Sequence, residues 1–522
     1  MKLCLQILSL ACLALSHVAV AEPAVIQRGA AFDPPSLDPN RGTATAAGPI
    51  LSDLVEGLVG RGNTGYPVPG CAESWTVSDD GLTYTFSLRE GLKWSDGKAL
   101  TADDFVYSLQ RLVDPATAAP AAGLFFIIKG GQAIARKQAP PESLGVSAPD
   151  PRTVVIQLER PAPYFIQLLA NSQGIPVPRH AIEKHGKDWT QAGLMVSNGA
   201  YTLVERVPQS HMRLVRNPLY FAADEVAIEE VYWRPVQDLG SAFRQFRAGE
   251  LDTVLMAPPD QLGWIRENMP KALHVNPIQA TYVLSFNVNR PPFDDVRVRR
   301  ALSLAVDRDV MAMQVLGGNV RAAPSLVTAG VGGYAGYEPR EMALNMAQRQ
   351  AEARQLLAAA GFNADNPLTV PVIYDTQEEN RKIMVAIAAM WRDIGVQTQL
   401  DSLEGRALFG RLRAKDYGVA RSAVFAVFDD PYAFLQKLES DSTDNRSGYQ
   451  NPAYDDLLAR ANKNRDPAAR LQMLGEAEAM LMADQPLLPV YWYVGKVLVA
   501  ERVQGWIDAP LGTPPTRYLS LD

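Results

Sequence analysis

The chain has 522 residues and a mass of 57.0 kDa, of which 47% are hydrophobic and 20% charged. This composition is typical of a folded globular protein and excludes a disordered or collagen-like chain. The length predicts two or three lobes, because single cores rarely grow beyond about 250–300 residues. A formal net charge of −7, with no stripe of Lys or Arg, argues against nucleic-acid binding.

The amino terminus has the pattern of a secretory signal. Lys2 provides the charged start, residues 3–15 are apolar, and Ala19-Val20-Ala21 is a small-residue cleavage site. We predict cleavage after Ala21 and a soluble exported protein. Cys12 suggests lipidation as an alternative, but Ser9 stands three residues before it and the apolar region continues past it.

Only Cys71 remains once residues 1–21 are removed, so the mature chain has no possible internal disulfide. A nucleophilic role for this thiol would need a nearby base, and no histidine is close in sequence. We therefore predict that Cys71 is a small buried core residue.

Caps and periodicity predict the elements in chain order. Thr101 and Asp295 are N-cap residues for helices, and the second helix carries Arg297, Arg299 and Arg300, which we predict to face solvent. Further helices are predicted at 348–360, 378–394, 452–463 and 467–483, and strands at 82–88, 153–158, 212–216, 230–233, 368–374, 396–400 and 490–499. Regular alternation of the two after residue 280 predicts an α/β lobe there and a mixed lobe before it.

Motifs for catalysis are missing from the chain. It contains no G-x-S-x-G, no H-E-x-x-H and no P-loop, and His180 and His185 are spaced to point to different faces of a helix. The glycine-rich stretch 330–333 is predicted to be a flexible loop. Asp429 and Asp430 suggest acid–base chemistry, although adjacent carboxylates more often form a turn or a cap. We predict no enzyme activity, no cofactor and no metal.

Several motifs span the mature chain and carry a resemblance to a known family. They are SLDP (36–39), LVEGL (54–58), PGCAESW (69–75), KWSDG (93–97), TADDFVYS (101–108), SNGAY (197–201), PPFDDVRVR (291–299) and PVYWYV (489–494). The chain resembles the extracytoplasmic solute-binding proteins of ABC importers, in the family of oligopeptide- and dipeptide-binding proteins. The resemblance implies a periplasmic, monomeric peptide receptor whose partners are a membrane permease and an ATPase, with membrane contact only through the permease.

The implied fold is α/β, a two-lobed clamp with an extra mixed α/β subdomain in the first lobe. Lobe I would comprise residues 22–65, 195–280 and 495–522, the extra subdomain 66–194, and lobe II 281–494. Strands crossing near 278–282 and 490–495 would form the hinge. A ligand that bridges both lobes would stabilise the closed form.

The resemblance also implies ligand-binding residues. Tyr282, Arg421 and Tyr493 match residues that line the cleft in relatives, while Phe425 and Phe428 could pack against the ligand or lie in the core. In relatives an aspartate pairs with the α-ammonium of the peptide, and alignment on 431–435 puts Val427 at that position.

Three explanations of this departure remain open. Asp429 or Asp430 replaces the missing aspartate; or the ligand is a blocked or modified peptide, or a non-peptide solute, without a free ammonium; or Val427 is simply core and the alignment slips by a residue or two. A secreted hydrolase is a remote alternative.

Overall fold

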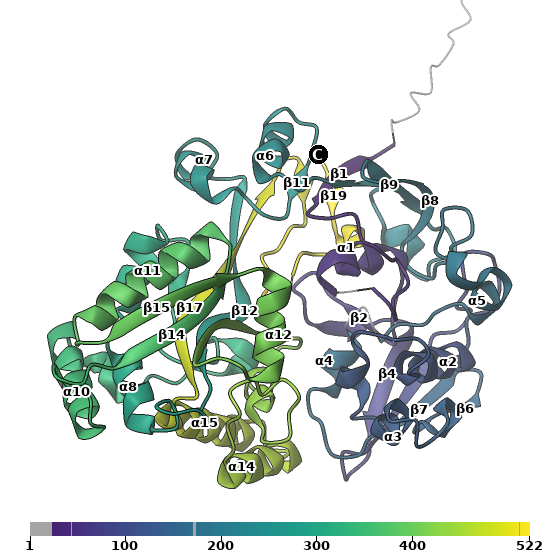
Figure 1. Ribbon diagram of the computed structural model, residues 1–522. Coiled ribbons are helices and arrows are strands. Elements are labelled where there is room, and N and C mark those ends of the chain that lie inside the picture. The colour runs from purple at the N-terminus through teal and green to yellow at the C-terminus, as the bar shows by residue number, and fades with distance from the viewer. Residues whose placement is uncertain (1–22, 43, 171–173, 511) are drawn as a thin grey trace, which may run out of the picture.

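The computed structural model describes residues 23–522 except 43, 171–173 and 511, and only the backbone of 44–46. The predicted signal, its cleavage site and Cys12 therefore lie outside the described residues. One mixed sheet of eleven strands runs through both halves of the molecule (Figure 1). Its order is β15 (Gln397–Leu403), β14 (Thr369–Asp375), β16 (Val419–Phe425), β12 (Leu273–Phe286), β17 (Leu487–Val499), β11 (Thr253–Val254), β1 (Val25–Ala30), β10 (Glu230–Pro235), β9 (His211–Arg216) and β8 (Tyr201–Val207), with β13 (Arg321–Ala322) beside β17.

Lobe I is the half of this sheet from β11 to β8 with its helices. The helices are α1 (Ala44–Leu54), α6 (Leu239–Arg247) and α7 (Leu262–Asn268). The chain returns to this lobe at its end through β18 (Val503–Gln504), η10 (Thr516–Tyr518) and β19 (Ser520–Leu521). A buried network ties that return to the first strand: Arg28 Nη1 donates to Thr516 Oγ1 at 2.6 Å, and the Thr516 amide donates to Asp53 at 2.8 Å.

The extra subdomain is built on a separate antiparallel sheet. Its strands, in spatial order, are β4 (Ala72–Val77), β5 (Thr83–Leu88), β7 (Thr153–Gln157) and β6 (Val146–Asp150), with helices α2 (Ala102–Val113), α3 (Gly131–Ala135), α4 (Phe165–Leu169) and α5 (Arg179–His185). A hairpin of β2 (Val59–Arg61) and β3 (Pro67–Pro69) precedes it. Helix α2 begins with the predicted capping box at Thr101. Cys71 is buried, as predicted.

Lobe II is an α/β unit around three parallel strands, β15, β14 and β16. Its main helices are α8 (Val296–Leu304), α10 (Met346–Ala359), α11 (Glu378–Arg392), α12 (Gly405–Ala414), α14 (Pro452–Lys463) and α15 (Pro467–Asp484). The Asp295 side chain accepts from the amide of Arg297 at the start of α8, as a cap should. The predicted alternation after residue 280 is confirmed.

The prediction of a solvent-facing arginine cluster on α8 is wrong for Arg299. Its guanidinium is buried and donates to the carbonyl of Phe293 at 2.8 Å and to the carbonyl of Asp484, the last residue of α15. A helix end leaves carbonyls without partners, and a cation is favourable there. Helical periodicity did not reveal this contact, because the partner helix comes almost 200 residues later.

Strands β12 and β17 connect the two lobes. The first half of β12 pairs with β17 where β17 also meets β11 of lobe I, and its second half pairs with β16 of lobe II. The register of β12 against β17 shifts between Pro277 and Thr281, and again between Tyr282 and Val283. Regular ladder pairing is therefore interrupted at the boundary between the lobes.

No helix in the described part of the chain is long and apolar enough to span a membrane.

Candidate ligand-binding cleft

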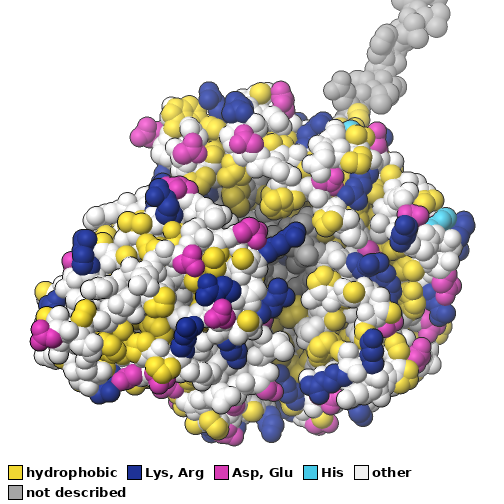
Figure 2. Space-filling view, viewed as in Figure 1, with side chains coloured by type: hydrophobic (Ala, Val, Ile, Leu, Met, Phe, Trp, Pro, Cys, Tyr) yellow, Lys and Arg dark blue, Asp and Glu magenta, His cyan; other side chains and the backbone are white. Residues whose placement is uncertain are grey.

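A hollow separates the two lobes in the space-filling view, with Lys and Arg side chains around it (Figure 2). Strands β12 and β17 join the lobes on one side. In α/β sheets, ligands bind where the loops follow the carboxyl ends of the strands. The loop after β16 carries four of the predicted site residues, Val427, Phe428, Asp429 and Asp430.

Aromatic side chains gather at the junction of β12, β16 and β17. Tyr282 is fully buried and stacks on Tyr491 with ring centroids 4.7 Å apart. Tyr493 lies 5.1 Å from Tyr491, and Phe425 stacks on Tyr493 at 5.6 Å. The Phe425 side chain is 51% exposed, so one face of this cluster is open to a ligand.

Arg421, which the sequence analysis named as a candidate site residue, lies over this cluster. Its guanidinium carbon is 5.0 Å from the centre of the Tyr282 ring, and Nη2 donates to the Tyr493 hydroxyl at 3.3 Å. Nη1 is 3.5 Å from Asp375 Oδ2. Burial raises the pKa of Tyr493 above its usual value of 10, although Arg421 opposes this. The Tyr493 hydroxyl therefore stays protonated at neutral pH.

The carboxylate of Asp429 is buried and accepts two hydrogen bonds. They come from the side chain of Gln279 on β12 and from the Gly332 amide, the latter at 3.0 Å. Tyr66 in the β2–β3 turn is close by, and burial together with the Asp429 charge raises the pKa of its hydroxyl. Gly332 has a φ of 55°, and a Cβ there would lie 2.9 Å from the Asp429 carbonyl oxygen. The stretch 330–333, predicted as a flexible loop, is thus packed closely against Asp429.

Asp430 is committed to a different partner. Arg470 of α15 binds it in bidentate fashion, with N···O distances of 2.6 and 3.0 Å, and both side chains are buried. Val427 is half-buried against the neighbouring core and brings no charge. The structure therefore gives Asp429 and Asp430 protein partners and leaves position 427 apolar.

The two lobes touch along a seam between the extra subdomain and the segment that follows β16. Tyr164 of the subdomain stacks on Phe428 of lobe II at 4.4 Å with an interplanar angle of 6°, and on Tyr432 at 5.1 Å. Arg160 donates to the Tyr432 hydroxyl at 3.0 Å, and that hydroxyl donates to Glu439 at 3.0 Å. Phe428 is thus buried in the contact between lobes, and Tyr164 is a residue that the sequence analysis missed.

Replacing Tyr164 with alanine should weaken this contact and thereby the arrangement in which the lobes touch. Each stacked aromatic pair contributes about 0.5–1.5 kcal/mol, so the loss of two pairs predicts a ligand affinity about tenfold lower. Titration calorimetry measures the affinity, and small-angle scattering measures the separation of the lobes. Tyr164→Phe keeps both stacks and should match the unmodified protein. An alanine variant with unchanged affinity and dimensions would contradict a role in closure.

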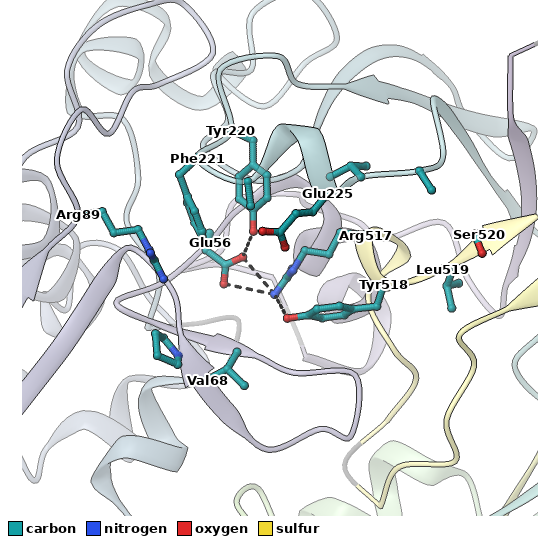
Figure 3. A pocket seen from close by; sticks show the side chains of 14 residues that line it. Glu56, Val68, Arg89, Tyr220, Phe221, Glu225, Arg517, Tyr518, Leu519 and Ser520 are labelled. Atoms are coloured by element: carbon teal, nitrogen blue, oxygen red, sulfur yellow. Dashed lines mark hydrogen bonds and ion pairs between the residues drawn. The ribbon is translucent and has the colours of Figure 1, made fainter.

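A second cavity, of about 620 Å³, lies in lobe I against the β2–β3 hairpin (Figure 3). Arg517 Nη2 is 3.1 Å from Glu56 Oε2, and the Tyr220 hydroxyl donates to the same oxygen at 3.1 Å. Burial raises the pKa of Glu56, while Arg517 opposes this. Glu56 and Arg517 thus satisfy each other's charge, which is what a structural ion pair requires.

The comparisons with known proteins agree with this geometry. The family model of the bacterial extracellular solute-binding proteins, family 5 Middle, matches residues 66–446. The chain therefore belongs to the bacterial extracellular solute-binding proteins of family 5.

Individual relatives cover nearly the whole chain. The chain is 36% identical to the periplasmic oligopeptide-binding protein OppA of Escherichia coli, over 97% of this chain and 94% of OppA. It is also 36% identical to the probable deoxycholate-binding periplasmic protein YgiS of Escherichia coli, over 92% and 90%. The structure of Haemophilus influenzae OppA in complex with the peptide RPPGFSPFR superposes with a TM-score of 0.81 and 31% identity, covering 96% and 99%.

Proposed function

We propose that this protein captures peptides in the periplasm and delivers them to the permease and ATPase of an ABC importer, without catalysis of its own. The observation that carries the proposal is the hollow between two lobes joined by β12 and β17, with Phe425, Tyr493 and Arg421 at the junction. A relative with the same fold was solved with a peptide bound. Peptide receptors bond the ligand backbone and leave room for varied side chains.

We propose that the lobes close about the interrupted pairing of β12 with β17. In this proposal residues 281–494 move as lobe II, and residues 22–65, 195–280 and 495–522 form lobe I with the subdomain 66–194 attached. The register shift between Pro277 and Thr281 supports this position for the hinge, because a break in the ladder eases bending. A ligand that contacts both lobes would then shift the population toward the closed form.

The site residues predicted from sequence enter this proposal with different roles. Tyr282, Arg421, Phe425 and Tyr493 form the lobe II side of the cleft, where the exposed ring can contact the ligand. Val427 supplies an apolar wall. Asp429 shapes the wall through its contacts with Gln279, Gly332 and Tyr66. Phe428 packs in the contact between the lobes, and Asp430 pairs with Arg470 in the core.

Native mass spectrometry of protein purified from its own periplasm tests the proposal. We expect a spread of bound peptides that dissociate on denaturation, and no turnover of added peptide by the purified protein. Hydrolysis of the peptide without added protease would contradict a pure receptor and favour the hydrolase alternative. A single non-peptide mass would contradict the peptide assignment.

The second candidate ligand is an amphipathic carboxylate such as deoxycholate. It is favoured by the exposed Phe425 ring beside an uncharged position 427, since such a molecule brings an apolar body and no ammonium. A relative is named as a probable deoxycholate-binding protein. Tight binding of deoxycholate with no binding of peptides by calorimetry would establish this candidate over the first.

A further inference from the structure

Arg61, the last residue of β2, is a partly buried cation for which no salt bridge is seen in the described part of the chain. Its Nη2 atom is buried and has no hydrogen-bond partner, and no carboxylate among the described residues pairs with it. Burial, together with the nearby charge of Arg517, lowers the pKa of Arg61 to about 10. The guanidinium therefore remains positive at neutral pH.

The other buried arginines of this region each have at least one acceptor, although the Nε atom of Arg28 has none. Arg28 donates to Thr516 and to the carbonyl of Pro514, and Arg517 pairs with Glu56. Desolvating a cation without an acceptor is unfavourable. A bound molecule with a carboxylate could supply the acceptor that the buried Nη2 of Arg61 lacks in the protein.

Two neighbours place Arg61 on the wall of lobe I that faces lobe II. Its own hairpin carries Tyr66, whose hydroxyl has its pKa raised first by burial and then by the nearby carboxylate of Asp429 of lobe II. On the other side its guanidinium lies against Gly512, where a Cβ would be 2.5 Å from Nη2. The segment with Gly512 begins at Ala509, whose carbonyl accepts from Asn276 on β12 at 2.9 Å. Arg61 thus lies between the strands that join the lobes and the loop after β16.

We propose that Arg61 binds a carboxylate of the ligand and makes this protein a receptor for anionic peptides. The inference rests on the proposed function and adds the charge class of the ligand. The charge-assisted N–H···O bonds of a guanidinium to a carboxylate are short and can be bidentate. Position 427, on the lobe II side of the cleft, carries valine and adds no carboxylate that would favour an ammonium.

Calorimetry with three blocked tripeptides tests the charge class. N-succinyl-trialanine amide has one carboxylate at its amino end, N-acetyl-trialanine has one at its carboxyl end, and N-acetyl-trialanine amide has none. We expect at least one anionic peptide to bind more tightly than the neutral one. Arg61→Gln should lower the affinity for that anionic peptide about 10- to 100-fold and leave the neutral peptide unchanged.

Two further variants control the experiment. Arg61→Lys keeps the charge and should retain most of the preference, while Arg244→Gln on the exposed surface of α6 should change nothing. The proposal is overturned if Arg61→Gln affects neither anionic peptide, or if it lowers all three affinities equally. If the unmodified protein binds none of the three peptides, the proposed peptide function fails together with the charge class. Thermal unfolding confirms that each variant is folded.

Discussion

Asp430→Asn is expected to destabilise the protein by about 3–5 kcal/mol, because it leaves Arg470 buried and charged without its partner. The carboxylate also accepts from the Tyr432 amide at 2.9 Å, so the turn after β16 should loosen as well. Chemical denaturation followed by fluorescence measures the loss. The effect should be on stability first and on ligand affinity only through the position of Tyr432.

The control for this experiment is Asp79→Asn. Asp79 is fully exposed and lies 3.8 Å from Arg465, so its replacement should leave the stability almost unchanged. The two outcomes at position 430 separate two hypotheses. An Asp430→Asn variant with normal stability and no affinity for free-amine peptides would show that Asp430 is the substitute for the missing aspartate, and would contradict a purely structural ion pair.

Glu478 of α15 should make the stability of lobe II depend on pH. The side chain is fully buried, and it accepts from the Val327 amide at 2.7 Å and from the Tyr334 hydroxyl at 2.8 Å. Burial raises its pKa to about 7 from the usual glutamate value of 4.5, against these hydrogen bonds. The folded state therefore binds a proton more tightly than the unfolded state does. The resulting stability is full below about pH 4.5 and is lost as the pH rises through about 7.

Glu478→Gln removes this titration and gives a direct measurement. A shift from 4.5 to about 7 corresponds to about 3 kcal/mol between the two pH limits. Relative to the unmodified protein, the glutamine variant should gain about that amount when denaturation is compared at pH 4.5 and at pH 8. Parallel stability curves for the two proteins over this range would contradict a raised pKa. Asp260, exposed on the surface of lobe I, supplies a control as Asp260→Asn.

Local signals in the sequence predicted many of the elements but not the way they meet. Caps at Thr101 and Asp295 located their helices, because a cap acts within one turn. The 14-residue strand β12 could not be found by alternation, since its last eight residues are all buried. The same limit explains Arg299, whose acceptors at the end of α15 come from a distant part of the chain.

In the candidate site, too, the sequence identified residues but not the contacts between them. The resemblance in motif order pointed to Tyr282, Arg421 and Tyr493, which the structure brings into one cluster. It gave no sign that Asp430 is paired with Arg470, or that Tyr164 contacts Phe428 across the seam. Arg61 also carried no signal, because an arginine that lacks an acceptor is recognised only when its surroundings are known.

The network of Arg28, Asp53 and Thr516 has a consequence for the order of folding. Arg28 stands in the first strand and Thr516 lies six residues from the carboxyl end, so their bond spans 488 positions. In a chain that crosses a membrane amino end first, Arg28 and Asp53 emerge early and cannot form their bonds to Thr516 until the end of the chain has crossed. In the proposed division lobe II is the single stretch 281–494, and it can fold while the last segment is still inside. Lobe I is completed last, and a chain truncated before Thr516 would leave a buried cation and a buried carboxylate without the residue that joins them.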